Sequence, residues 1–416
     1  MALRYYLLLA SALPLGMALP VSDRQTSAVK AFSISQVYNP HFSTNNGVAA
    51  HKKALAKYTI PSSQVGLSAT TASSSPIGNS FVATSGVATP GVAPANAIDY
   101  TDLEYLTPVT VGGKTYMLDF DTGSSDLWIG GQNTGARDKY TPTSKPLSTQ
   151  SWSITYGDES NAAGDVYSET VVVGGTTATA VAVGRATNAP NSFFALGANG
   201  QPGSDGLLGL GFSSSNTFQP QQKTWFDTAV SQGLPPMFAA NLMFGTASGS
   251  YDFGGVNPAS YTGDITFLDV VPGQNPLNKY WMVAPAMGDV GVMDTGTTLM
   301  LLSSTTTQAY YSSPAALAAG AQWIAPSDGS ASFWAYNCNS TLPDFTVTLN
   351  DMEAVVPGGY LNYQTLSNGL CYSAIQNRDP SMTFSIYGDR FLMSLYVVFD
   401  LRDSNNPRIG FAGKSV

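Results

Sequence analysis

One four-residue pattern occurs twice in this chain and constrains its fold more strongly than any other feature. The copies are Asp121-Thr122-Gly123-Ser124 and Asp294-Thr295-Gly296-Thr297. Each copy follows a short apolar stretch. This context predicts a strand that ends in a tight glycine turn and lifts one carboxylate out of a sheet. A pseudo-symmetric fold would then bring Asp121 and Asp294 face to face.

A second repeated pattern accompanies the first. Leu207-Leu208-Gly209 follows Asp121, and Ile386-Tyr387-Gly388 follows Asp294 after a similar number of residues. Two apolar residues followed by glycine are common by chance, so the support comes from the near-equal interval. A single Asp-Thr-Gly is most often an ordinary turn. Two copies in matching apolar settings favour two repeated halves that share one site.

The composition favours strands over helices. The chain contains 41 glycines, only 11% of its 416 residues are charged, and Ser, Thr and Val are abundant. Its 43% hydrophobic residues can fill the cores of two domains. Segments 105–111 and 115–120 are predicted to form a hairpin around Gly112-Gly113. Helical patterns are confined to 48–58, 221–232 and 304–319. We therefore expect an all-β fold.

Charge and histidine content exclude several classes of function. The formal net charge is −9, and Asp23 is the only acid in the first 98 residues, so the rest of the chain is strongly acidic and disfavours nucleic acid. Both histidines, His41 and His51, lie near the N-terminus. If that segment is removed, a Ser-His-Asp or Cys-His mechanism lacks its base, and zinc lacks histidine ligands. We expect no metal and no cofactor.

The two cysteines, Cys338 and Cys371, are predicted to form one disulfide. It would close a loop of about thirty residues and contribute roughly 3–4 kcal/mol on the chain-entropy model. Two buried free thiols are the less favoured alternative.

The N-terminus has the pattern of a secretory signal over residues 1–18, with Arg4 before an apolar run and small residues at 16–18. Residues 19–90 are interpreted as a removable segment and linker, basic at first and then rich in Ser, Thr, Ala, Gly and Pro. No later segment is long and apolar enough to span a bilayer. We expect a secreted, extracellular product without a membrane anchor.

Two aspartates in one site carry a specific chemistry. Like charges a few ångströms apart cannot both ionise freely, so the pair holds one proton over a range of acidic pH. Such a pair can deprotonate water with one oxygen and protonate a carbonyl with another. Ser124 and Thr297 are placed to hydrogen-bond the carboxylates, and Gly123 and Gly296 let the backbone pass close to a substrate.

With these patterns the sequence resembles the secreted fungal aspartic proteases of the pepsin family, of the aspergillopepsin and penicillopepsin group. Proton sharing between two aspartates is the known behaviour of that family. The resemblance extends from Tyr105 to Ala412. It is carried by the segments 104–111, 119–128 (Asp-Phe-Asp-Thr-Gly-Ser-Ser-Asp-Leu-Trp), 152–158 (Trp-Ser-Ile-Thr-Tyr-Gly-Asp), 205–212, 294–298 and 396–400.

The resemblance implies a bilobal fold, with an N-terminal lobe at 91–263, a C-terminal lobe at 264–416, and a peptide-binding cleft between them covered by a hairpin flap. It implies protein and peptide substrates, inhibition by pepstatin-type compounds, and a monomer. The site residues that it implies are the dyad Asp121 and Asp294, the loop-tying Thr122 and Thr295, the flap residues Tyr156, Gly157 and Asp158, Trp128 as the hydrogen-bond partner of Tyr156, and the subsite residues Leu207, Tyr280 and Val292.

Asp158 bears on substrate choice. An acid at the flap tip is associated in this fungal group with acceptance of lysine before the scissile bond, because a carboxylate over a desolvated pocket pairs with a cation. The chain departs from the family at Glu159, where glycine is usual, and this leaves the inference about lysine open. The segments 129–155 and 281–293 are also shorter than usual. We expect mainly apolar subsites with tolerance of lysine.

The basic N-terminal stretch resembles the family's inhibitory pro-segment. Lys57-Tyr58 matches the family's Lys-Tyr pair, in which the lysine pairs with the catalytic aspartates and blocks the cleft. A pro-segment that only assists folding is the alternative. Asn339 begins an Asn-Ser-Thr sequon and is a candidate glycosylation site.

Two other functions remain open on the sequence. The first is a catalytically silent pepsin-like binding protein, although such proteins usually lose an aspartate or the flap tyrosine. The second is a vacuolar rather than exported protease, against which the absence of a first-lobe cysteine pair argues weakly.

Overall fold

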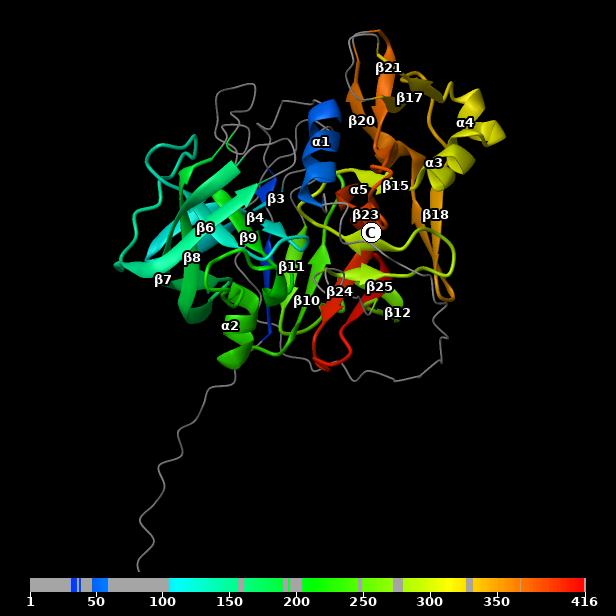
Figure 1. The fold of residues 1–416 in the computed structure, drawn as a ribbon. Helices are drawn as coiled ribbons and strands as arrows, with labels where there is room; N and C mark the ends of the chain where they lie inside the picture. Colours follow the sequence, from blue (N-terminus) through cyan, green and yellow to red (C-terminus); the bar gives the residue numbers. More distant parts are fainter. Residues whose placement is uncertain are drawn as a thin grey trace, which may run out of the picture.

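The fold consists mainly of β-strands arranged in two lobes, which confirms the all-β prediction (Figure 1). The computed structural model describes residues 31–35, 37–38, 47–58, 105–155, 161–189, 194, 204–245, 249–271, 280–326, 332–366 and 368–414. The predicted signal 1–18, most of the linker and the flap residues 156–158 lie outside these ranges. In the described part of the chain, no helix is long and apolar enough to cross a membrane.

The N-terminal lobe is built on an eight-stranded sheet with the order β2-β3-β4-β9-β5-β8-β7-β6. Its strands are β2 (Val37–Tyr38), β3 (Tyr105–Val111), β4 (Lys114–Asp121), β5 (Leu127–Gly130), β6 (Pro146–Thr155), β7 (Asn161–Val173), β8 (Thr176–Asn188) and β9 (Gly206–Gly209). The predicted hairpin is confirmed by the antiparallel pairing of β3 with β4. Gly112 and Gly113 form its turn with φ angles of 57° and 86°, which glycine adopts without steric cost.

The C-terminal lobe contains three smaller sheets. The first has the order β13-β14-β23-β15-β22, the second β16-β17-β21-β20, and the third pairs β18 with β19. Their bounds are β13 (Met282–Val283), β14 (Gly291–Met293), β15 (Met300–Leu302), β16 (Gln322–Ile324), β17 (Phe333–Asn337), β18 (Phe345–Leu349), β19 (Met352–Val356), β20 (Asn362–Thr365), β21 (Leu370–Ser373), β22 (Ile375–Asn377) and β23 (Ser385–Tyr387). The first of these sheets carries the second Asp-Thr-Gly.

A six-stranded sheet, ordered β1-β11-β10-β24-β25-β12, joins the two halves of the chain (Figure 1). Its strands are β1 (Phe32–Ser35), β10 (Met237–Asn241), β11 (Ser250–Phe253), β12 (Tyr261–Asp269), β24 (Leu395–Asp400) and β25 (Arg408–Lys414). Because β10 pairs with β24, the end of one half hydrogen-bonds directly to the end of the other. The lobe boundary expected between residues 263 and 264 falls within β12 and stays a prediction.

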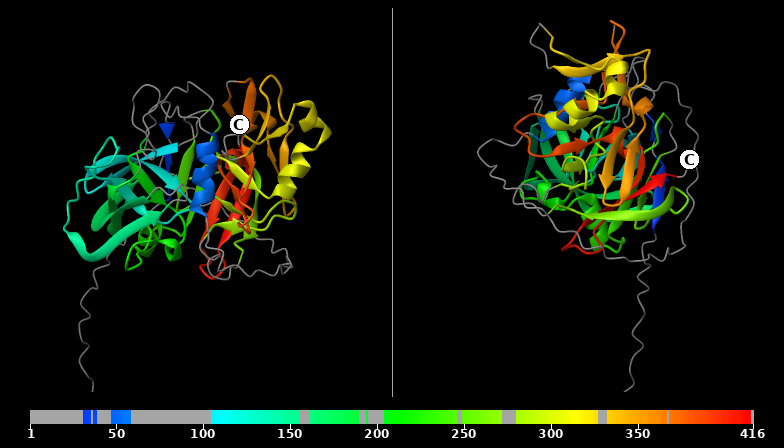
Figure 2. Two further views of the ribbon diagram at one scale, coloured as in Figure 1. Left: turned by 45° about the horizontal axis from the view of Figure 1, so that its top comes forward. Right: turned by 90° about the vertical axis from the view of Figure 1, so that its right-hand side faces the viewer.

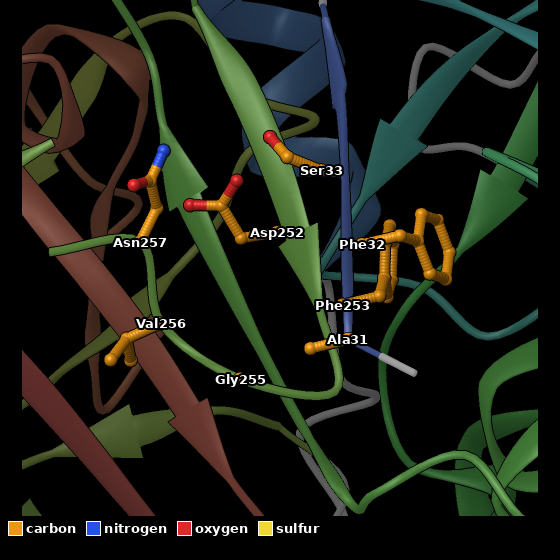
Figure 3. A pocket seen from close by; sticks show the side chains of 8 residues that line it. All are labelled: Ala31, Phe32, Ser33, Asp252, Phe253, Gly255, Val256 and Asn257. Atoms are coloured by element: carbon orange, nitrogen blue, oxygen red, sulfur yellow. The ribbon is translucent and has the colours of Figure 1, made fainter. Parts of the chain in front are cut away.

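Strand β1 comes from the N-terminal segment and is not among the elements predicted above. It pairs antiparallel with β11, so that Phe32 lies opposite Phe253. The two rings stack with centroids 5.3 Å apart, and Ser33 lies beside Asp252 on the same pair of strands (Figure 3). The alternation Phe-Ser-Ile-Ser is the period-two pattern of a half-buried strand, but four residues are too few to stand out in the sequence.

The helices are short. They are α1 (Gly47–Lys57), α2 (Trp225–Ser231), α3 (Ser304–Tyr311), α4 (Pro314–Ala318) and α5 (Asp389–Leu392). The helical pattern predicted at 304–319 is two helices rather than one. The Ser313 side chain accepts from the Ala316 N–H and caps α4, and Pro314 occupies its first turn, so the chain turns between α3 and α4.

The predicted disulfide is present between Cys338 and Cys371, which are 33 residues apart. It connects the chain just after β17 to strand β21, which also pairs with β17 in the same sheet. The covalent link and the strand pairing therefore constrain the same part of the C-terminal lobe.

Candidate active site

Each Asp-Thr-Gly lies at the end of a strand that runs parallel to one of the second repeated patterns. Strand β4 pairs with β9, which places Asp121 opposite Gly209. In the other lobe β14 pairs with β23, and the Asp294 N–H donates to the Tyr387 carbonyl. The near-equal interval between the two patterns therefore reflects the same pair of parallel strands in both halves.

Each aspartate is held by equivalent hydrogen bonds from its own loop. The Gly123 N–H donates to Asp121 Oδ1 over 2.8 Å, and the Gly296 N–H donates to Asp294 Oδ1 over 3.0 Å. The expected hydroxyl contacts are present as well. Ser124 Oγ donates to Asp121 Oδ2, and Thr297 Oγ1 donates to Asp294 Oδ2, each over 2.5 Å. In both carboxylates, the inner oxygen Oδ1 and the outer oxygen Oδ2 are thus fixed in matching orientations.

The two loops approach each other so closely that only glycine fits between them. A Cβ atom on Gly123 would lie 2.4 Å from Asp294 Oδ1, and one on Gly296 would lie 2.4 Å from Asp121 Oδ1. Each carboxylate therefore packs against the glycine of the opposite loop. The fold brings Asp121 and Asp294 face to face, as the repeated pattern predicts, and both are buried.

Two threonines join the loops across the lobe interface. The Thr122 N–H donates to Thr295 Oγ1 over 3.1 Å, and the Thr295 N–H donates to Thr122 Oγ1 over 3.0 Å. Each hydroxyl then donates to a carbonyl of the other half, Thr122 to Met293 at 2.7 Å and Thr295 to Phe120 at 2.6 Å. This reciprocal set of buried hydrogen bonds fixes the separation and orientation of the two aspartates.

A lysine from the N-terminal segment occupies the space between the carboxylates. Helix α1 lies between the lobes (Figure 2), and its last residue, Lys57, places Nζ 2.5 Å from Asp121 Oδ1 and 2.9 Å from Asp294 Oδ1. One ammonium group therefore bridges both aspartates. A group of that size at this position excludes a water molecule or a substrate from the same place.

Tyr58 fills an aromatic pocket next to the lysine. Its ring contacts Tyr280 and Phe384 edge-on, with centroids 5.0 and 5.6 Å away, and the residue is 1% exposed. Its hydroxyl lies over Gly123. Phe384 is not among the residues predicted from the sequence. It stands two residues before Ile386-Tyr387-Gly388, the second copy of the apolar pattern, and that proximity could have marked it as a site residue.

Burial and neighbouring charges move the pKa values of the two aspartates in opposite directions. Burial raises the pKa of Asp121, and the charge of Asp294 adds to this rise against the effect of Lys57. Burial also acts to raise the pKa of Asp294, but Lys57 and the hydrogen bonds from Asp121 and Thr297 outweigh it and lower that pKa. Burial would lower the pKa of Lys57, yet the two carboxylates raise it, so the ammonium stays charged.

The remaining predicted residues lie in different settings. Trp128 and Leu207 belong to one apolar cluster near Trp152, whose indole lies 5.4 Å from that of Trp128. Val292 is fully buried within β14, and Tyr280 is partly buried beside Tyr58. Roles of these residues in binding substrate stay predictions. Tyr156, Gly157 and Asp158 lie outside the described residues.

The threonine cross-links generate a stability prediction. Thr122→Val leaves the Thr295 N–H and the Met293 carbonyl buried without their partner, whereas Thr122→Ser keeps the hydroxyl. We expect the valine variant to lose about 2–4 kcal/mol of unfolding free energy relative to the serine variant, measured by urea denaturation. Equal stability of the two variants would show that the hydroxyl does not tie the loops together.

Comparison with known proteins agrees with this geometry. A family model described as eukaryotic aspartyl protease matches residues 104–414. Penicillopepsin-2 from Penicillium janthinellum is 44% identical over 327 residues, which cover 75% of this chain and 78% of that protein. Aspartic protease pepA from Leptosphaeria maculans is 39% identical over 416 residues and covers 95% of both chains.

A solved structure supports the same assignment. The crystal structure of an aspartic proteinase from Irpex lacteus aligns with a TM-score of 0.59 and 25% identity, over 75% of this chain and 95% of that one. The sequence relatives, the family model and the fold therefore agree. This chain belongs to the eukaryotic aspartyl protease family, and it is an aspartic endopeptidase.

Proposed function

We propose that Asp121 and Asp294 are the catalytic pair of a secreted, acid-active endopeptidase that is made as an inactive precursor. The observation that carries this proposal is the position of Lys57 Nζ, within 2.9 Å of one oxygen from each aspartate. A site that holds one ammonium nitrogen between both carboxylates can hold one water oxygen there after the lysine has left.

The chemistry follows from the shared proton. One carboxylate accepts a proton from the water, whose oxygen then bonds to the carbonyl carbon of the substrate. The proton on the other carboxyl group is donated to the carbonyl oxygen, which gives a neutral tetrahedral diol. Transfer of a proton to the amide nitrogen then allows the C–N bond to break. Ser124 and Thr297 hold the outer oxygens, so each carboxylate keeps its orientation throughout.

The catalytic pair is tested by removing one acid at a time. We expect Asp121→Asn and Asp294→Asn each to lower hydrolysis of a denatured protein at acidic pH by about 10³-fold or more, because an amide cannot exchange the proton. The matched control is Asp269→Asn, an exposed residue of β12 remote from the site. Full activity in either dyad variant would refute the assignment.

The N-terminal segment is proposed to inhibit the enzyme until acidification. With Lys57 in place, the pKa of Asp294 is lowered, so the ion pair stabilises the closed state above the ordinary aspartate pKa of 3.8 and is lost as pH falls through the lowered value. Strands β1 and β2 and helix α1 supply further contacts with the mature part of the chain. Release at acidic pH then exposes the carboxylates.

Replacing the lysine tests inhibition directly. Lys57→Met keeps a side chain of similar length but removes the charge, so the uncut variant should cleave a small peptide at pH 5–6 faster than the uncut wild-type chain does. Lys114→Met, an exposed lysine of the mature part, is the control. If both variants behave as wild type, the segment serves folding rather than inhibition.

Subsites around the cleft are proposed to be mainly apolar, with tolerance of lysine before the scissile bond. Support comes from the aromatic pocket of Tyr280 and Phe384 that receives Tyr58. Asp158→Asn should lower kcat/KM for a lysine peptide relative to its phenylalanine analogue by about tenfold. Glu159→Gln is the matched control for loss of a neighbouring negative charge. An unchanged ratio in Asp158→Asn would contradict the proposed lysine contact.

Export, cleavage and modification complete the proposal. Residues 1–18 are proposed to direct secretion, the linker to be cut between about residues 78 and 98, and the product to act as a monomer inhibited by pepstatin-type compounds. Asn339 is exposed and adjoins the disulfide, which suits a glycan. A loss of mass after enzymatic deglycosylation, absent in Asn339→Gln, would establish that modification.

A further inference from the structure

Helix α1 packs on the C-terminal lobe through one face. Among the side chains described in α1, Gly47, His51 and Ala54 are buried, and Tyr58 continues this series just after the helix. Their spacing of four, three and four residues places them along one side. His51 is the member of this series whose ordinary pKa lies near mildly acidic pH.

His51 makes two hydrogen bonds that suit the neutral ring. Nε2 lies 2.7 Å from the carbonyl oxygen of Asn377 at the end of β22, and Nδ1 lies 3.3 Å from the hydroxyl of Tyr372 on β21. A carbonyl oxygen only accepts, so Nε2 carries the hydrogen and Nδ1 of the neutral ring accepts from Tyr372. The side chain is 4% exposed, so both contacts are made away from solvent.

The same lobe holds the start of the helix. The Gly47 N–H donates to Gln364 Oε1 over 2.8 Å, and a Cβ on Gly47 would lie 2.6 Å from the ring of Tyr372. Tyr372 therefore supports α1 at both Gly47 and His51. At the other end of the same helix, Lys57 reaches the two aspartates. Loosening the helix at His51 would remove the support that positions Lys57.

We infer that His51 is a pH-sensitive contact of the inhibitory segment: the neutral ring holds α1 on the C-terminal lobe, and protonation of the ring releases it. This inference rests on the proposed inhibition by Lys57. It adds a second trigger that is separate from protonation of the aspartates.

The surroundings of His51 disfavour its protonated form. A hydrogen on Nδ1 would point at the Tyr372 oxygen, so the hydroxyl would have to turn away, and a positive charge would be buried. Strand β15, which also contacts α1, contributes only Met300, Leu301 and Leu302, none of which titrates. Burial keeps the Tyr372 hydroxyl protonated by raising its pKa.

Charged groups on the elements that carry or contact His51 do not offset that cost. Arg378 follows Asn377 and is itself a cation that interacts with Asp289, and Lys57 on α1 is paired with the dyad. Within the described ranges, no carboxylate forms an ion pair with His51. Burial therefore lowers the pKa of His51 below its ordinary 6.5, against a smaller opposite effect of the Asn377 hydrogen bond.

The sign of the pH effect follows. Because the pKa of His51 is lower in the docked helix than in the released one, the contact is at full strength above pH 6.5 and weakens as pH falls toward the lowered value. Between pH 6.5 and that lowered value, the equilibrium constant for docking of α1 on the C-terminal lobe falls by up to tenfold per pH unit. The ion pair of Lys57 with Asp294 persists to lower pH, because the lysine holds the pKa of Asp294 below its ordinary 3.8. His51 therefore responds at a higher pH than Asp294 does.

The test compares full-length chains that differ only in the removable segment. His51→Gln keeps an N–H for the Asn377 carbonyl but cannot be protonated. Conversion to the mature length is followed by electrophoresis from pH 7 to 3, and each rate is divided by the wild-type rate at the same pH. This ratio cancels the pH dependence of catalysis, since the mature parts are identical. It should be about one at pH 7 and about 0.1 at pH 5.

Controls separate the possible failures. His41→Gln removes the chain's other histidine and should keep a ratio of one. If Lys57→Met fails to relieve inhibition, the proposed inhibitory function is wrong. If Lys57→Met relieves it but the His51→Gln ratio stays constant with pH, only the role of His51 is overturned.

If the His51→Gln substitution itself weakens docking of helix α1, the conversion rate of the variant will exceed the wild-type rate at pH 7. A direct titration of His51 tests the inference in that case. The chain has two histidines, so selective ¹³C labelling of histidine gives two ring signals, and His41→Gln assigns them. We expect His51 in the uncut chain to titrate at lower pH than in the isolated peptide 30–60. Equal titration midpoints in the two would overturn the inference.

Discussion

The reciprocal hydrogen bonds between Thr122 and Thr295 cross the interface of the lobes and hold the two Asp-Thr-Gly loops against each other. All later features of the site depend on this contact. It sets Gly123 and Gly296 beneath the opposite carboxylates, where a side chain would collide with them. It also buries two acidic groups side by side. Two ionised carboxylates repel each other in that arrangement, but the pair can share one proton.

The N-terminal segment, which we propose to be inhibitory, makes use of that unfavourable arrangement. An ammonium group between two buried carboxylates relieves their repulsion, and the carboxylates in turn keep the buried ammonium charged. The same interaction makes the closed state sensitive to acid, because protonated carboxyl groups no longer attract the lysine. His51, on the same helix, makes its contacts with the C-terminal lobe as a neutral ring. In the proposed activation, the ionised aspartates and the neutral His51 ring both hold the segment in place at high pH. Protonation of either kind of group favours release of the segment at low pH.

The sequence indicated much of the site because the chemistry is local to each loop. Glycine turns after apolar strands, and hydroxyls three residues after each aspartate, predict the carboxylate contacts that the structure contains. Elements whose stability comes from distant partners were harder to predict. Strand β1 exists because β11 supplies its hydrogen bonds, and Phe384 contributes to the aromatic pocket only because Tyr58 and Tyr280 meet there.

The amino-acid sequence by itself determined that there are two equivalent aspartate loops, a predominantly β fold, one cysteine pair, and a basic N-terminal segment with Lys57-Tyr58. These follow from residue type and spacing, which act over a few residues. Only the tertiary structure decided which groups meet: the bridging of both aspartates by Lys57, the pocket around Tyr58, and the docking of His51 on Tyr372 and Asn377. Those contacts join residues up to several hundred positions apart, and their partners are fixed by packing of the whole chain rather than by any local pattern.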